Sequence, residues 1–159
     1  MSVLQRLTRL LLAAMMAVAI VNLLIGVFLR YIMTEITDLL DLEMIRFTWV
    51  EEVGEFTLAW MAMIGGAVGI RERAHFTLHL GVERLPARAQ RTIAVANALL
   101  ITGFGCLVAW HGWGLAMLNT QLESPALELN LAWLYGSVVV GGVLIALSGV
   151  RLVRDASAA

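Results

Sequence analysis

The sequence has 159 residues, of which 60% are hydrophobic and only 14% are charged, and its mean hydropathy is +0.86. This composition excludes an intrinsically disordered chain and is typical of a membrane protein. The net charge of −1 gives no basis for nucleic-acid binding. Because Cys106 is the one cysteine in the sequence, an intrachain disulfide and a zinc site built from thiolates are excluded.

Four apolar segments are long enough to cross a bilayer, which takes about 20 residues of helix. They comprise residues 10–29, 53–70, 92–118 and 131–150. The second segment contains one acid, Glu55, and the other three contain no charged residue. We therefore predict one all-α membrane domain, residues 1–159, with four transmembrane helices. The first segment is longer than the usual core of a signal peptide, so we expect an anchored helix there.

The arginines predict the orientation of the chain in the membrane. All of the 11 basic residues except Arg30 and Arg46 lie before the first segment, between the second and third, or after the fourth. Positively charged connections stay in the cytoplasm. Both termini are therefore expected to be cytoplasmic.

Two connections are predicted to be amphipathic segments in the membrane interface. Residues 31–47 place apolar side chains at helical spacing and repeat acids every three residues, so this segment can lie flat on the outer surface. An irregular polar loop is the alternative. Residues 71–91 mix arginines with apolar side chains, which favours a second interfacial segment attracted to anionic lipid headgroups.

Three acids, Glu51, Glu52 and Glu55, lie around the start of the second segment. Thr48 and Glu51 fit a capping box, and acids in the first turns of a helix are stabilised by its dipole. These effects can account for the acids through helix stability alone. Three acids at one helix end also suit a surface that contacts a partner, so both interpretations stay open.

Other polar residues predict no chemistry. His75 and His79 have the spacing of a ligand pair, but His111 lies near the opposite membrane face, because it is far along a helix that starts on the cytoplasmic side. We expect no catalytic, metal-binding or cofactor-binding residue. The spans also lack a central charge and prolines, unlike transporters that bind substrate at the midplane. An accessory or scaffold subunit is therefore favoured over a small four-helix membrane enzyme or electron carrier, or a self-sufficient exporter that uses Glu55.

Small residues recur four apart in the second and fourth segments, including Gly65 and Gly66 in the second and Gly141 and Gly142 in the fourth. Such spacing lets two helices approach closely. The glycines are expected to serve packing within this chain or against a partner.

Several short motifs then occur in a recognisable order: Arg30-Tyr31, Trp49-Val50-Glu51-Glu52, Gly65-Gly66-Ala67, Arg71-Glu72-Arg73-Ala74-His75-Phe76, Leu85-Pro86 and Glu123-Ser124-Pro125-Ala126-Leu127. With them the chain resembles the small membrane subunit, of the DctQ type, of tripartite ATP-independent periplasmic (TRAP) transporters. The resemblance covers nearly the whole chain. Two positions depart from it: His79 replaces a common aspartate, and Glu128-Leu129-Asn130 replaces the usual Ile-Pro.

The resemblance implies a scaffold subunit in the bacterial inner membrane. A periplasmic binding protein would deliver an organic acid, such as a C4-dicarboxylate, to a large multi-span subunit that holds the substrate and the coupling sodium. The small subunit would be required with it for uptake, would contact membrane lipids and would hold no cofactor. The candidates for partner contacts are Trp49, Glu51, Glu52, Glu55, Gly65, Gly66, Arg71, Arg73 and His75.

Overall fold

The structure is a computed structural model that describes residues 3–40, 47–71 and 85–158. Four helices make up these residues almost entirely: α1 (Val3–Leu40), α2 (Thr48–Arg71), α4 (Ala87–Leu118) and α5 (Ala132–Ala158). All four are long and apolar enough to cross a membrane. The predicted all-α fold with four membrane-crossing helices is confirmed.

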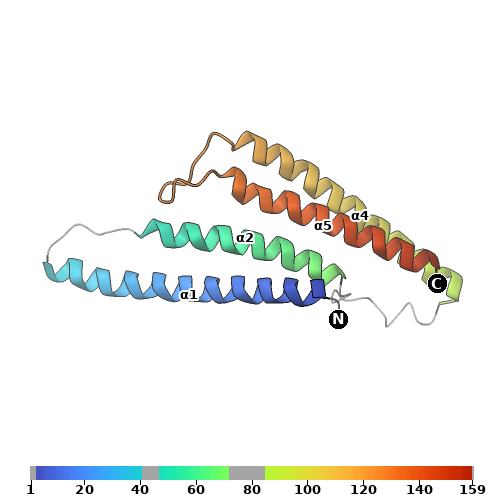
Figure 1. Ribbon diagram of the computed structural model, residues 1–159, viewed down its shortest axis with the longest axis horizontal. Coiled ribbons are helices and arrows are strands. Elements are labelled where there is room, and N and C mark those ends of the chain that lie inside the picture. Colours follow the sequence, from blue (N-terminus) through green and yellow to red (C-terminus); the bar gives the residue numbers. More distant parts are fainter. Residues whose placement is uncertain (1–2, 41–46, 72–84, 159) are drawn as a thin grey trace.

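The helices run alternately in opposite directions (Figure 1). In the ribbon view α5 lies between α2 and α4, and α1 packs along the free side of α2. The first residues of α1 and the last residues of α5 lie at the same end of the bundle, which we call the terminal end. The opposite end, where residues 119–131 connect α4 to α5, is called the loop end. The cytoplasmic location of the terminal end stays a prediction.

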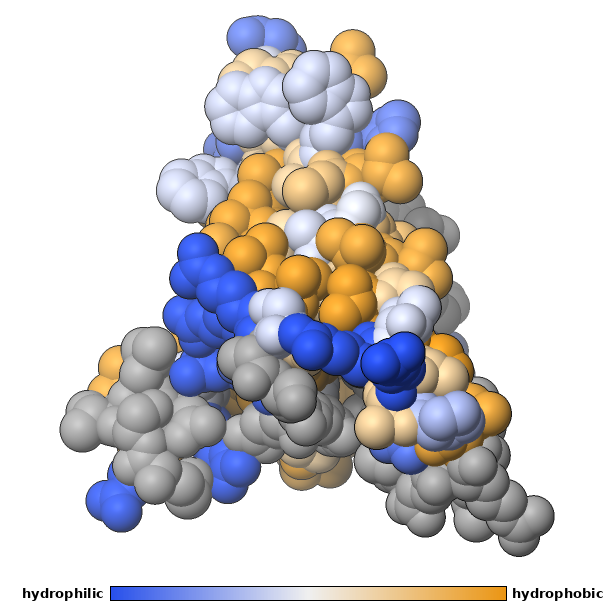
Figure 2. Space-filling view, turned by 90° about the vertical axis from the view of Figure 1, so that its right-hand side faces the viewer, coloured by the Kyte–Doolittle hydropathy of each residue, from blue (hydrophilic) through white to orange (hydrophobic). Residues whose placement is uncertain are grey.

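The terminal end is more hydrophilic than the sides of the bundle. Figure 2 looks at this end and shows hydrophilic side chains on the near surface, with a mostly hydrophobic surface behind them. A hydrocarbon core accepts apolar side chains and excludes arginine, so this distribution fits a bundle that crosses a bilayer.

The closest helix pair is α4 and α5, which meet through glycines. A Cβ atom added at Gly142 would lie 2.8 Å from Ala109 Cα and 2.9 Å from the carbonyl oxygen of Gly105. A Cβ atom at Gly105 would in turn lie 2.8 Å from Ala146 Cα. Real Cβ atoms do not approach backbone this closely, so glycine is needed where the two helices cross.

The small residues of α2 behave differently from those of α5. Gly141 on α5 packs against α2, where an added Cβ would lie 2.6 Å from Met63 Cβ. At Gly66 an added Cβ would meet nothing within 4 Å, and at Gly65 it would meet only Leu12 Cδ2, at 3.9 Å. Within the described residues, close packing is therefore confirmed for Gly141, Gly142 and Gly149 of α5, whereas Gly66 makes no such contact.

Helix α1 is held to α2 by a buried amide. The Asn22 side chain is buried, and its Nδ2 donates a 2.7 Å hydrogen bond to the carbonyl oxygen of Val50. One turn further along α1, an added Cβ at Gly26 would lie 2.8 Å from Val50 Cγ1. Asn22 was not predicted as a contact residue from the sequence. The signal was present, because Asn22 is the one amide in the apolar segment 10–29.

The first predicted interfacial segment differs in the structure. Residues 31–40 continue α1 without a break and do not form a separate element. Thr34 Oγ1 and Thr37 Oγ1 donate hydrogen bonds to the carbonyls of Arg30 and Met33, one turn back, so these side chains satisfy their polar groups inside the helix. Residues 41–46, and residues 72–84 of the second segment, lie outside the described residues.

Candidate interaction site at the loop end

The connection from α4 to α5 folds into a small hairpin. Glu123 and Asn130 face each other in an antiparallel bridge. Beside them, the Ser124 N–H donates to the Leu129 carbonyl at 2.8 Å, and the Leu131 N–H donates to the Leu122 carbonyl at 2.9 Å. These bonds give the connection a defined shape, with residues 125–128 at its tip.

Polar side chains fix both ends of this hairpin. Asn130 Nδ2 donates to the Thr120 carbonyl at 2.5 Å, while Asn130 Oδ1 accepts a 2.8 Å bond from the Ala132 N–H at the start of α5. Ser124 Oγ accepts a 3.2 Å bond from the Leu129 N–H. The tip closes at Glu128, whose φ of 52° lies in the left-handed region that non-glycine residues seldom adopt.

Glu52, near the start of α2, binds the tip of the hairpin. Its Oε1 accepts a 2.7 Å hydrogen bond from the Ala126 N–H, and its Oε2 accepts a 2.9 Å bond from the Leu127 N–H. Glu52 is only 7% exposed. Hydrogen bonds to a carboxylate are shorter and stronger than those between neutral groups. We call this arrangement of Glu52, Ala126 and Leu127 the Glu52 clasp.

The clasp gives Glu52 a role inside the chain. Both of its oxygens accept bonds from the hairpin, which lies more than 70 residues away in the sequence. The local pattern around Glu52 contains no sign of this contact. Its role is therefore to position the hairpin, whatever the hairpin then contacts.

Glu51 and Glu55 have different surroundings from Glu52. Glu51 Oε1 lies 3.1 Å from Arg30 Nη2, and the two side chains are 65% and 79% exposed, so this ion pair joins α2 to α1 at the surface. Glu51 is thus engaged with α1, and the capping box with Thr48 stays a prediction. Glu55 is exposed one turn further along α2.

One side of α2 forms a continuous stripe, exposed at every position except the half-buried Gly66. The residues on it follow each other at helical spacing, and we call them the α2 stripe: Glu51, Glu55, Leu58, Ala62 and Gly66. Acids occupy the end of the stripe near the hairpin, and small residues occupy its far half. A stripe of this kind can accept a second helix that brings a hydrogen-bond donor to Glu55.

The remaining candidate residues are not all in one place. Trp49 is 38% exposed at the loop end. Arg71 ends α2 at the terminal end, a full helix length from Glu52. Arg73, His75 and His79 lie outside the described residues, and His111 is exposed on α4. The structure therefore brings Trp49, Glu51, Glu52 and Glu55 to one end and places Arg71 at the other.

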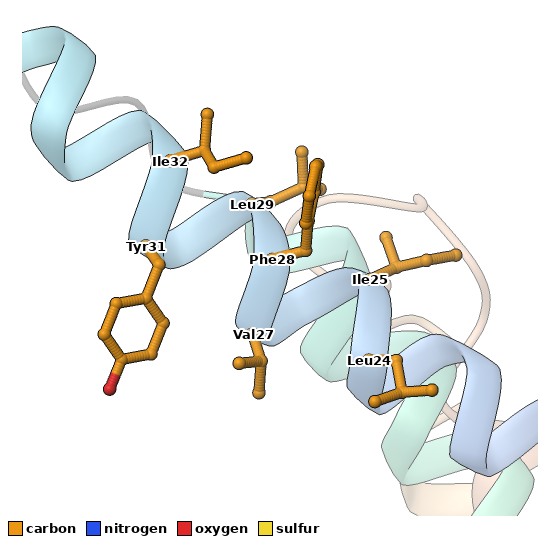
Figure 3. Close-up of a pocket in the computed structure, with 7 residues that line it drawn as sticks. All are labelled: Leu24, Ile25, Val27, Phe28, Leu29, Tyr31 and Ile32. Atoms are coloured by element: carbon orange, nitrogen blue, oxygen red, sulfur yellow. The ribbon is translucent and has the colours of Figure 1, made fainter.

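One hollow on the described surface is apolar and open, and α1 alone lines it. Figure 3 shows Leu24, Val27 and Tyr31 on one side of the helix and Ile25, Phe28 and Ile32 on the other. Apolar side chains without internal partners are suited to lipid tails or to an apolar helix. Within the described residues, no group of three His, Cys, Asp or Glu side chains could hold a metal ion.

Comparison with known proteins gives consistent matches. Residues 19–158 match the family described as "Tripartite ATP-independent periplasmic transporters, DctQ component". The chain is 24% identical over 98 residues to the sialic acid TRAP transporter small permease protein SiaQ of Vibrio cholerae. The matched residues make up 61% of this chain and 56% of the relative. It is 28% identical over 106 residues to the C4-dicarboxylate TRAP transporter small permease protein DctQ of Rhodobacter capsulatus, covering 64% and 45%. The chain thus spans about half the length of these relatives.

Proposed function

Because the chain belongs to the DctQ family of small TRAP transporter subunits, we propose that it is the membrane scaffold of a sodium-coupled importer of organic acids. The observation that carries the proposal is the family match over residues 19–158. The family consists of transporter subunits, and the chain is accordingly not an enzyme. Together with the four apolar helices, this points to a multi-pass protein of the inner membrane.

The names of the relatives support an acid as the solute. One relative is named for sialic acid and the other for C4-dicarboxylates, and both solutes carry carboxylates. We therefore propose organic acids as the substrate class, with C4-dicarboxylates as the first to test. Sodium and substrate are proposed to bind in the large membrane subunit.

We propose that the large subunit covers the α2 stripe. An exposed carboxylate at Glu55 is costly beside lipid unless a partner supplies a donor, and Gly66 leaves room for a helix to come close. The exposed apolar side chains of α1 flank this surface. Trp49, Gly65, Arg71, Arg73 and His75 remain proposed contacts.

The loop end is proposed to face the periplasm, with both termini in the cytoplasm. The hairpin would then lie on the side from which a periplasmic binding protein approaches. The Glu52 clasp would hold its tip in one conformation for docking, since a preordered loop loses less conformational entropy on binding.

Reconstitution tests the proposed function. Liposomes would contain this chain, the large TRAP membrane subunit of the same organism, or both, with the periplasmic binding protein and labelled succinate outside. We expect uptake only when all three proteins and an inward sodium gradient are present. Uptake that is unchanged when this chain is omitted, or when sodium is replaced by potassium, would contradict the proposal.

A pair of glycine variants tests the proposed partner surface. Gly66→Leu and Gly103→Leu both begin a side chain where an added Cβ meets nothing within 4 Å, and the thermal midpoint of each purified variant checks that the chain itself is undisturbed. Only Gly66→Leu should reduce co-purification with the large subunit, because only Gly66 lies on the α2 stripe. Equal recovery of the complex for both variants would show that the partner binds elsewhere.

A further inference from the structure

We propose that the terminal end of the α4 and α5 pair binds the phosphate of an anionic phospholipid, through Arg91, Arg151 and Arg154. The proposal concerns the lipid bilayer around the subunit and does not depend on which solute is transported.

Arg91, near the start of α4, lies beside the end of α5. Helices α4 and α5 are antiparallel and pack closely where Gly149 meets Thr102, so the start of α4 lies beside the end of α5. The Arg91 guanidinium donates a hydrogen bond to the carbonyl oxygen of Ser157, in the last turn of α5. A cation at this position also interacts favourably with the negative end of the helix dipole. Because a guanidinium has five N–H donors, Arg91 keeps donors for a ligand.

Arg91 contacts α5 at Ser157, which lies on the same side of this helix as two arginines. Arg151, Arg154 and Ser157 are three residues apart and therefore share one side of the helix. Ser157 Oγ donates a 2.9 Å bond to the carbonyl of Arg154, which places these two residues next to each other. Arg151 and Arg154 are exposed, and no acid forms an ion pair with them within the described residues.

A further arginine adds to the positive charge around Arg91, Arg151 and Arg154. Arg88 is exposed one turn before Arg91, and it adds to the positive potential at this end. Asp155 is the acid within α5, and it already makes an interaction of its own. The exposed acids Glu51, Glu55 and Glu123 lie at the opposite end of the bundle. Two or more arginines beside one another favour a phosphate, to which guanidinium donates paired hydrogen bonds.

Exposed apolar side chains next to these arginines favour a lipid over a soluble phosphate. Leu147 and Val150 lie four residues before Arg151 and Arg154, so they share the same side of α5 one turn toward the loop end. They are 54% and 38% exposed. Figure 2 shows the same transition from a hydrophilic end to an apolar side. An anionic headgroup at the arginines would thus place its acyl chains on Leu147 and Val150.

Native mass spectrometry of the purified full chain tests the site. The chain would be titrated with phosphatidylglycerol and, separately, with phosphatidylcholine of the same acyl chains. We expect tighter binding of phosphatidylglycerol, by about fivefold for each arginine that the headgroup contacts. Equal binding of the two lipids by the unchanged chain would overturn the proposal.

Variants then locate the site. Arg151→Gln with Arg154→Gln should lower the preference for phosphatidylglycerol by about 25-fold, and the matched lysine variants should keep most of it. Arg30→Gln, which removes one positive charge at the loop end and is the control for Arg151→Gln alone, should leave the preference unchanged. If the glutamine pair fails to fold, Arg151→Gln alone should still lower the preference by about fivefold. A preference that is undiminished in the glutamine pair, or that millimolar inorganic phosphate abolishes in the unchanged chain, would overturn an anionic lipid site.

Discussion

The two halves of the bundle are held together in different ways. In the α4 and α5 half, backbone packs on backbone around Gly105 and Gly142. In the α1 and α2 half, contact depends on the Asn22 amide, on Gly26 against Val50, and on an exposed ion pair at Arg30. Burial follows the same division: in the most apolar stretch of each helix, 33% of the residues are buried in α5 and 6% in α1.

The comparison shows which kind of sequence specifies helix packing in a membrane. Lipid tails are as apolar as leucine, so apolar side chains alone do not draw two helices together. Small residues allow close approach, and a buried amide requires a hydrogen-bond partner. Helix α5 has many small residues, whereas α1 is apolar on nearly all sides, which leaves α1 with surface for lipid or a partner.

The largest effect is expected in the glycine-packed half. Gly142→Ala would place a methyl group 2.8 Å from Ala109 Cα, where backbone cannot yield, and should cost about 3 kcal/mol, the upper end for overpacking. The thermal midpoint of the purified chain in detergent measures this loss. Gly103→Ala is the control, because an added Cβ there is unobstructed and alanine favours the helix. Equal midpoints would mean that α4 and α5 do not cross at Gly142.

The next effect concerns the contact between the two halves. Glu52→Gln removes the charge and one acceptor from the clasp, so the tip of the hairpin should open more often. Hydrogen exchange of the peptide 122–131 should accelerate by about tenfold, because one of the two amides loses its acceptor and the other keeps only a neutral one. Glu55→Gln, one turn away and exposed, should leave that exchange unchanged. Unaltered exchange in Glu52→Gln would show that the hairpin keeps its shape without the clasp.

A smaller effect is expected for Asn22. Asn22→Leu removes the bond to Val50, which in a membrane is worth about 0.6 to 1.7 kcal/mol. A disulfide can report the pairing: the Cβ positions of Gly26 and Val50 are 3.9 Å apart, within the range for a disulfide. In a Cys106→Ala background, Gly26→Cys with Val50→Cys should cross-link readily, and less so when Asn22→Leu is added. Failure of the first pair to cross-link would refute the α1 and α2 contact.

The smallest effect is expected for the exposed ion pair. Arg30→Gln or Glu51→Gln should lower stability by less than about 1 kcal/mol, because the pair is largely in solvent. Because 0.5 M salt screens an exposed ion pair, it should lower the thermal midpoint of the unchanged chain slightly more than that of either variant. A larger loss than for Asn22→Leu would reverse the order proposed for the α1 contacts.

The fold was predictable because the sequence contains four long segments with few or no charged residues. A bilayer leaves few alternatives for segments such as 92–118, so four helices followed from the sequence. The extent of α1 did not follow, because Glu35 and Asp38 interrupt the apolar run while the helix continues to Leu40. Helix formation depends on backbone bonds and not on hydropathy alone.

The candidate site was predictable only in part. The acids at the start of α2 were recognised, but their different roles were not: Glu52 binds the hairpin, Glu51 binds Arg30, and Glu55 is exposed. Local spacing does not distinguish these roles, because they depend on which helix lies alongside. The same limit applies to Gly66 and Gly142, which have similar neighbours in sequence and different ones in space.

The Glu52 clasp also bears on how the protein is made. Glu52 lies in the first half of the chain, and the amides that it binds lie between the last two helices. During synthesis the carboxylate therefore waits without these donors until α4 and α5 have entered the membrane. Closure of the clasp therefore requires that the first and second halves of the chain have already come together.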